Sequence, residues 1–211
     1  NPCVYYHEQR NIRTEVHGDD FTSLAPIPAL HWFHEELTKV WTIKVRGILG
    51  PPGTEGTVQK IDILNRLVTW TDAGIEYEAD PRHAEIIASD LGVTGKAVTP
   101  MSKEKADDAE EGMEELAPEL RTTYRSNTMR AAYLSQDRPD ISAAIRELAQ
   151  GMQKPLNHHW AKLKRLARYL NYKPRMVQRF PYQRGVVKYE CWCDSNHAGC
   201  IRTRKSTSGG A

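Results

Sequence analysis

The most informative absence from this sequence of 211 residues is that of a long apolar run. No stretch approaches the roughly 18 apolar residues that a membrane-spanning helix requires. No secretory signal peptide opens the chain, which does not begin with Met. We therefore expect a protein that is not secreted and that has no membrane partner.

Cysteine is also scarce, with four residues in the chain, and this excludes a secreted disulfide framework. Three of the four occur close together, in "CWCDSNHAGC". One interpretation of this stretch is a zinc site. Its ligands would be Cys191, Cys193, His197 and Cys200. Structural zinc sites usually place at least two residues between paired cysteines, and alternate residues of a strand share one face. Cysteines packed inside a strand are therefore the interpretation that we favour.

Charge is unevenly distributed along the chain, although the net charge is only +2. Residues 102–119 contain eight acidic residues and two lysines. Few large apolar side chains interrupt them, which is typical of a flexible linker. From residue 154 onward, thirteen Lys and Arg occur against two acidic residues. This basic part is either a surface that binds a polyanion or a solvated face, and charge alone does not decide between them.

Strands and helices are expected in separate groups. Alternating or β-branched patterns predict strands at residues 3–7, 11–17, 21–25, 41–47, 60–70, 74–80, 176–182 and 186–194. Apolar residues at helical spacing, with capping residues, predict helices at residues 28–41, 81–91, 120–136, 138–152 and 156–170. Asp80 and Asn157 are the expected caps of two of these helices. This order predicts an α+β fold with a boundary near the acidic stretch.

The motif "GDD" joins two of the expected strands. Gly and Asp both tolerate turn geometry, so an ordinary polar hairpin turn explains the motif. A pair of carboxylates that holds a metal ion explains it as well, because hard divalent cations prefer oxygen ligands. The motif by itself favours the turn.

Several segments, taken in order, resemble one family. "CVYYHEQRNIRTEVHGDDF" and "KIDILNR…GIEYEADPRHAEIIASDLGV" resemble the polymerase hairpin and the following segment of a copia-type retrotransposon reverse transcriptase. "YRSNTMRAAYLSQDRPDISAAIRELAQGM" and "HHWAKLKRLARYL" resemble its connection region, and "CWCDSNHAGCIRTRKSTSGG" resembles the start of its ribonuclease H domain. The resemblance covers essentially the whole chain. It implies a fragment of a Pol polyprotein that is cut at both ends.

The resemblance implies roles for three acidic residues. Asp19 would bind a catalytic Mg²⁺ ion, with Asp20 as the second member of the pair, and Asp194 would be the first metal-binding aspartate of the ribonuclease H domain. The sequence departs from the family pattern at His17 and Gly18, and at Asn196 and His197. The family's third polymerase carboxylate would lie before residue 1, so we expect the isolated chain to be inactive.

The resemblance also implies the parts and partners of the protein. Residues 1–100 would be the palm-like part of the polymerase and 101–118 an acidic linker. Residues 119–175 would be a helical connection, and 176–211 the first strands of a ribonuclease H-like sheet. The partners would be an RNA–DNA or DNA template–primer, nucleoside triphosphates and the rest of the Pol polyprotein, in a cytoplasmic particle or the nucleus.

The basic helix and the residues after it are the candidates for phosphate contacts. They are Lys162, Lys164, Arg165, Arg168, Lys173 and Arg175. Arg138 and Asp140, which flank Pro139, are expected to form a structural ion pair, and His158 and His159 to cap and pack the basic helix. Two other functions remain open: a non-catalytic nucleic-acid-binding or scaffold domain derived from a retroelement, and an unrelated α+β domain with a basic face.

Overall fold

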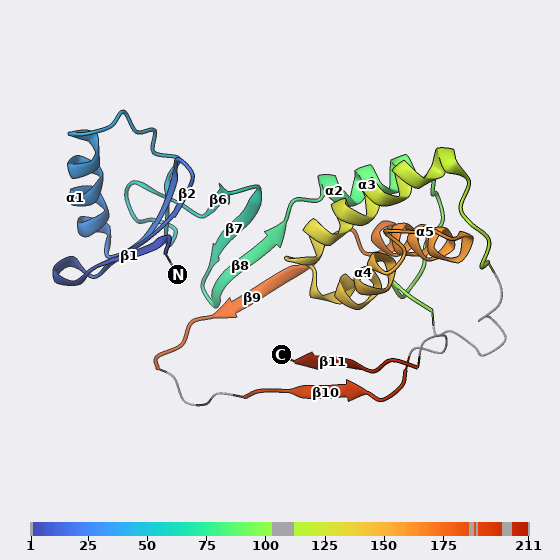
Figure 1. The fold of residues 1–211 in the computed structure, drawn as a ribbon. Helices are drawn as coiled ribbons and strands as arrows, with labels where there is room; N and C mark the ends of the chain where they lie inside the picture. The colour runs from blue at the N-terminus through green and yellow to red at the C-terminus, as the bar shows by residue number, and fades with distance from the viewer. Residues whose placement is uncertain (1, 103–111, 186–187, 189, 200–203, 211) are drawn as a thin grey trace. The chain divides into compact units, whose positions relative to one another are not determined.

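The protein is α+β, with antiparallel sheets and five α-helices in the part of the chain that the structure describes. The computed structural model describes residues 2–102, 112–185, 188, 190–199 and 204–210. It divides into two compact units, residues 1–64 and 65–211 (Figure 1). No described helix is long and apolar enough to span a membrane.

The first unit is built on a three-stranded antiparallel sheet with helix α1 beside it (Figure 1). Its elements are β1 (Val4–His7), a 3-10 helix (Glu8–Arg10), β2 (Ile12–His17), β3 (Asp20–Leu24), α1 (Ile27–Thr38), β4 (Ile48–Leu49), β5 (Thr57–Val58) and β6 (Lys60–Ile63). The three predicted strands of the hairpin region and the predicted helix are therefore confirmed. The strand expected at residues 41–47 is wrong, because residues 42–47 take no regular structure.

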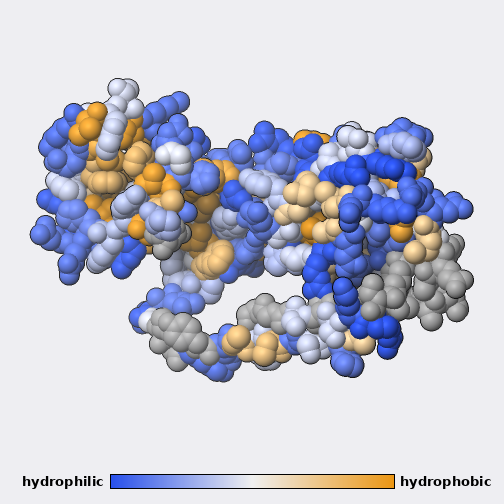
Figure 2. Space-filling model, viewed as in Figure 1, coloured by the Kyte–Doolittle hydropathy of each residue, from blue (hydrophilic) through white to orange (hydrophobic). Residues whose placement is uncertain are grey.

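The inner face of this sheet and helix α1 line an apolar groove of about 430 Å³. From the sheet come Tyr5, Ile12, Val16 and Phe21, and from α1 and the residue stretch after it Phe33, Leu37 and Trp41. Apolar side chains on alternate residues of β2 explain why this face turns toward the helix. Hydrophobic residues are also visible on the surface of this unit in Figure 2.

The second unit begins with three antiparallel strands that run β7-β8-β9. They are β7 (Arg66–Thr71), β8 (Gly74–Ala79) and β9 (Val177–Pro181). Gly74 starts β8 opposite Pro181, with a φ of +152°. A Cβ atom at Gly74 would lie 2.1 Å from the carbonyl oxygen of Phe180. The absence of a side chain is therefore what allows β9, from far along the sequence, to approach β8.

Replacing Gly74 by alanine is expected to lower the free energy of unfolding by about 2 kcal/mol, because the new methyl group cannot be accommodated without moving β9. Urea denaturation would measure the change. Gly185→Ala is the matched control, because no atom lies within 4 Å of its added Cβ. Equal stability of the two variants would contradict the close approach of β9.

Four helices form the core of the second unit (Figure 1). They are α2 (Arg82–Asp90), α3 (Pro118–Ser135), α4 (Ser142–Ala149), which follows a 3-10 helix (Pro139–Ile141), and α5 (Asn157–Tyr172). The predicted inward stripe of α5 is confirmed: Leu163, Ala167 and Leu170 are buried. The buried Tyr124 of α3 donates a hydrogen bond to the carbonyl oxygen of Leu148, 2.5 Å away, which ties α3 to α4.

The ends of two helices are held by side chains. Asp80 Oδ1 accepts the backbone N–H of Arg82 at 2.9 Å, so Asp80 binds the start of α2 as expected, although the N-cap position itself is occupied by Pro81 and not by Asp80. At α5, Asn157 is already the first helical residue, so its predicted role as the cap is wrong. The side-chain hydrogen bond at this helix end is made instead by His159, whose Nδ1 accepts the backbone N–H of Leu156. This agrees with the capping role expected for the histidine pair.

The last described elements are a two-stranded antiparallel ladder of β10 (Cys193–Asn196) and β11 (Thr207–Gly210). The strand predicted at residues 186–194 is largely wrong, because residues 190–192 take no regular structure and β10 begins at Cys193. Residues 186–187 and 189 lie outside the described part. Half of the acidic stretch, residues 103–111, also lies outside it.

Candidate functional site

The "GDD" motif forms the tip of the hairpin between β2 and β3. His17 pairs with Asp20, so Gly18 and Asp19 are the two residues of a tight loop. Gly18 has a φ of +64°, which the first position of such a loop requires and which glycine adopts without strain. Asp19 is consequently exposed at the tip, while Asp20 is the first residue of β3.

Asp20 has a partner that the sequence did not indicate. The guanidinium of Arg46 lies 3.4 Å from Asp20 Oδ1, and both side chains are exposed. An exposed pair of this length contributes at most about 1 kcal/mol. Because the two residues lie 26 positions apart, and because residues 41–47 were expected to form a strand, no local pattern could have identified this contact.

The carboxylates of Asp19 and Asp20 are oxygen donors of the kind that Mg²⁺ prefers. Within the described residues, however, no three His, Cys, Asp or Glu side chains come together to hold a metal ion. The donor type therefore fits Mg²⁺, and these two carboxylates supply only part of a ligand set. The further carboxylate expected from before residue 1 stays a prediction.

Asp194 lies in β10, and its Oδ1 accepts the backbone N–H of Ser195 at 2.8 Å. Around it, the side chains of Cys191, Cys193 and His197 are exposed. The interpretation of buried strand cysteines is therefore wrong for Cys191 and Cys193, since both side chains are exposed and Cys191 precedes β10. Cys200, the fourth residue of the alternative zinc site, lies outside the described residues.

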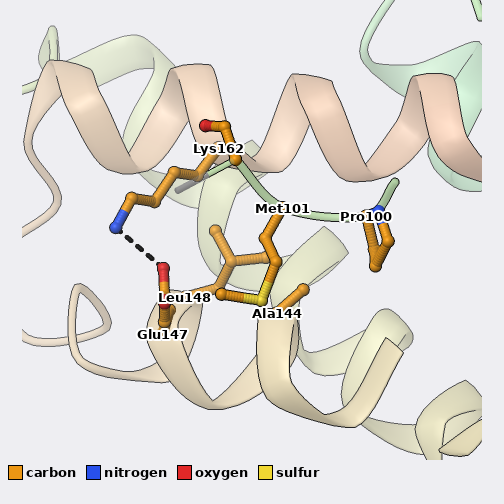
Figure 3. A pocket seen from close by; sticks show the side chains of 7 residues that line it. Pro100, Met101, Ala144, Glu147, Leu148 and Lys162 are labelled. Carbon is orange, nitrogen blue, oxygen red and sulfur yellow. Dashed lines mark hydrogen bonds and ion pairs between the residues drawn. The ribbon is translucent and has the colours of Figure 1, made fainter. Parts of the chain in front are cut away.

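Two of the six predicted phosphate-binding residues form ion pairs within the protein. Lys162 Nζ lies 2.8 Å from Glu147 Oε2, and this pair lines a small pocket between α4 and α5 (Figure 3). Arg175 binds both carboxylate oxygens of Glu78, at 2.6 and 2.7 Å. Glu78 is only 7% exposed, so the arginine compensates a buried charge. These contacts span 15 and 97 residues of sequence, and sequence patterns could not reveal them.

The other four predicted phosphate-binding residues differ from Lys162 and Arg175, because they form no ion pair with a carboxylate of the described residues. Lys164 lies with its ammonium 5.4 Å from the centre of the Trp160 ring. Arg165 donates a hydrogen bond to Thr99 Oγ1 at 2.8 Å. The side chains of Arg168 and Lys173 are exposed. None of these contacts neutralises a cation with a carboxylate.

Arg138 and Asp140 form the ion pair predicted between them. The guanidinium binds both carboxylate oxygens, at 2.9 and 2.8 Å, and it also donates to the carbonyl oxygens of Lys173 and Pro174. Tyr169 donates a further hydrogen bond to Asp140 at 2.7 Å. This cluster joins the start of α4 to the end of α5, so its role is structural, as expected.

Comparison with known proteins gives three informative similarities. The chain is 34% identical over 87 residues to the uncharacterized mitochondrial protein AtMg00810 of Arabidopsis thaliana, covering 41% of this chain and 35% of that protein. It is 38% identical over 72 residues to the secreted RxLR effector protein 161 of Plasmopara viticola, covering 34% and 50%. It is 34% identical over 88 residues to the retrovirus-related Pol polyprotein from transposon RE2 of Arabidopsis thaliana, covering 42% and 6%.

The matched part of the chain thus spans half or less of the length of each of these relatives. No family model matches the chain, and no solved structure matches it. The similarity to a Pol polyprotein nevertheless agrees with the family that the sequence resembles. The chain is therefore related to a retrotransposon Pol polyprotein, at modest identity and over part of its length.

Proposed function

We propose that this chain is part of a retrotransposon reverse transcriptase, which makes DNA on an RNA template with Mg²⁺ and nucleoside triphosphates. Residues 1–100 would belong to its palm-like part. The C-terminal strands β10 and β11, with Asp194, would be the start of an appended ribonuclease H domain. The remainder of the Pol polyprotein would supply the missing parts of both.

The observation that carries this proposal is the position of Asp19. A two-residue loop places its carboxylate at the exposed tip of a hairpin, with Asp20 directly after it. A hairpin holds such side chains in fixed positions, which suits a group that must bind a metal ion with narrow geometry. Bound Mg²⁺ would supply charge stabilisation for nucleotidyl transfer. The residues of this chain would hold it and leave the other ligand positions to phosphate, water and a further carboxylate.

A second function is favoured by a different observation. Arg46 lies beside Asp20 and would compete with a metal ion for its carboxylate. By contrast, Lys164, Arg165 and Arg168 of α5 form no ion pair with a carboxylate of the described residues. A retroelement-derived domain that binds nucleic acid without catalysis would have these properties. The two functions differ in one respect that can be measured, since only the polymerase requires a divalent metal ion to extend a primer.

Primer extension on an RNA template by the longer Pol protein that carries this segment tests the proposal. We expect synthesis that stops when the metal ion is chelated. The isolated chain of 211 residues is expected to show none, because its described residues bring together no complete set of metal ligands. Primer extension by the isolated chain would contradict the proposal that another part of the Pol protein supplies a further carboxylate of the metal site.

A further inference from the structure

The segment that follows α2 lies across helix α5. The backbone N–H of Ala97 donates to the carbonyl oxygen of Arg168 at 3.1 Å. Asn171 donates from its side chain to the carbonyl oxygen of Val93 at 2.9 Å. Thr99 accepts the hydrogen bond from Arg165. Residues 93–101, which we call the crossing segment, are therefore fixed to α5 at several points.

The C-terminal end of the crossing segment is held by packing. Met101 lines the pocket between α4 and α5, next to Leu148 and Lys162 (Figure 3). Thr99 donates its hydroxyl to the carbonyl oxygen of Met101 at 2.9 Å. Because both ends of the crossing segment are anchored, the side chains between them have defined positions relative to α5.

Lys96 is the cation that this arrangement adds to α5. It is exposed and lies between two residues that both contact Arg168. On one side is Ala97, with its backbone hydrogen bond. On the other side is Gly95, where a Cβ atom would lie 3.6 Å from Arg168 Nε. Lys96 thus lies between two residues that contact Arg168, although 72 positions separate Lys96 and Arg168 in the sequence.

A third cation lies on the same face of the helix. Lys164 precedes Arg168 by four residues, and side chains at this spacing are neighbours on a helix surface. No carboxylate within the described part of the chain pairs with Lys96, Lys164 or Arg168 in an ion pair. The three basic residues therefore occupy neighbouring positions on α5 and the crossing segment.

We propose that Lys96, Lys164 and Arg168 form one patch that binds the phosphate backbone of a double-stranded nucleic acid. This inference rests on the proposed function and changes its residues. Lys96 joins the site, whereas Lys162 and Arg175 leave it, because each already compensates a carboxylate of the protein. The side chains of the patch would contact phosphate groups and not base edges, so the patch binds without preference for base sequence.

Binding of a short RNA–DNA hybrid to the purified 211-residue chain, measured by fluorescence anisotropy over a series of salt concentrations, tests the patch. A plot of log affinity against log salt concentration has a negative slope. Each phosphate contact that is lost should reduce the steepness of this slope by about 0.9. We expect this decrease for Lys96→Ala and a further decrease for Lys96→Ala combined with Lys164→Ala. Lys96→Glu should weaken binding more than Lys96→Ala.

Lys154→Ala is the matched control. It removes one charge from an exposed lysine of the same unit, and that lysine is paired with Glu115 at 2.8 Å. We expect it to leave the slope within about 0.3 of the wild-type value, since it makes no phosphate contact. Arg168→Ala also removes packing against the crossing segment, so its circular dichroism spectrum must match that of the wild type before its slope is compared.

The outcomes separate this inference from the proposed function. If Lys96→Ala and Lys154→Ala have the same slope, the patch is wrong, whatever the polymerase does. If the folded wild-type chain does not bind the hybrid, the patch is also wrong, and metal-dependent extension by the longer protein still tests the polymerase separately. If Lys162→Ala reduces the steepness of the slope as much as Lys96→Ala does, Lys162 also contacts phosphate, and its exclusion from the patch is wrong.

Discussion

Replacing Asp19 by asparagine in the longer Pol protein is expected to reduce RNA-templated primer extension by at least about a hundredfold. Such a loss corresponds to about 3 kcal/mol of transition-state stabilisation, within the several kcal/mol that a bound metal ion supplies. Asparagine keeps the shape of the side chain but removes its charge. The exposed position of Asp19 in the tight loop means that the fold should not change.

Two further variants make this result specific. Asp20→Asn should also reduce extension, but less, if Asp20 is the second member of the pair. Glu55→Gln removes one negative charge from an exposed loop of the same unit and should leave extension within about twofold of wild type, as expected for a surface change away from the site. Undiminished synthesis by the Asp19→Asn protein would exclude Asp19 as a metal ligand.

Replacing Arg138 by methionine is expected to lower the free energy of unfolding of the second unit by about 3 kcal/mol. Arg138 is 1% exposed and donates to Asp140 and to two backbone carbonyl oxygens. Methionine fills much of the volume but leaves these acceptors without their donor, and one of them is a partly buried carboxylate. Urea denaturation followed by far-ultraviolet circular dichroism would report the change, because helices α2 to α5 lie in this unit.

The pH dependence of this variant provides a second readout. Burial alone would raise the pKa of Asp140, but the hydrogen bonds from Arg138 and Tyr169 outweigh it and hold the pKa below its ordinary value of 3.8. A carboxyl whose pKa is lower in the folded state stabilises the protein above its unfolded-state pKa, and this contribution is lost as the pH falls through the folded-state value. The stability difference between wild type and Arg138→Met should therefore shrink below pH 3.8.

Arg179→Met is the control for the loss of an arginine. Arg179 pairs with Glu76 at 3.0 Å, but its side chain is 79% exposed. Such a pair contributes about 0.5 kcal/mol. If Arg138→Met were no more destabilising than Arg179→Met, the cluster around Asp140 would not hold α4 and α5 together.

Local sequence patterns predicted the elements that local forces determine. The hairpin of β2 and β3, the inward stripe of α5 and the hydrogen bond of Asp80 to the start of α2 all depend on residues within one turn or one strand pair. The strand at residues 41–47 failed, since alternation of apolar residues gives no strand where no neighbouring strand is available for pairing. Cys191, which was expected in a buried strand, precedes β10 and is exposed.

The candidate site was only partly predictable for a related reason. A basic helix is visible in the sequence, but the partners of its cations are not, because Glu147, Glu78 and Thr99 come from distant positions. Sequence alone therefore treated Lys162 like Lys164, whereas the fold gives the first a carboxylate and the second an aromatic ring. Lys96 was missed since nothing near it in the sequence indicates that its segment crosses α5.

The most direct test of the account is RNA-templated primer extension by the Pol protein that carries this segment, with Mg²⁺ present and after its removal by a chelator. The account predicts extension with Mg²⁺, loss of extension on chelation and recovery when Mg²⁺ is returned. A folded protein that binds the RNA–DNA hybrid but never extends the primer would contradict the proposed polymerase and would support a domain that binds nucleic acid without catalysis.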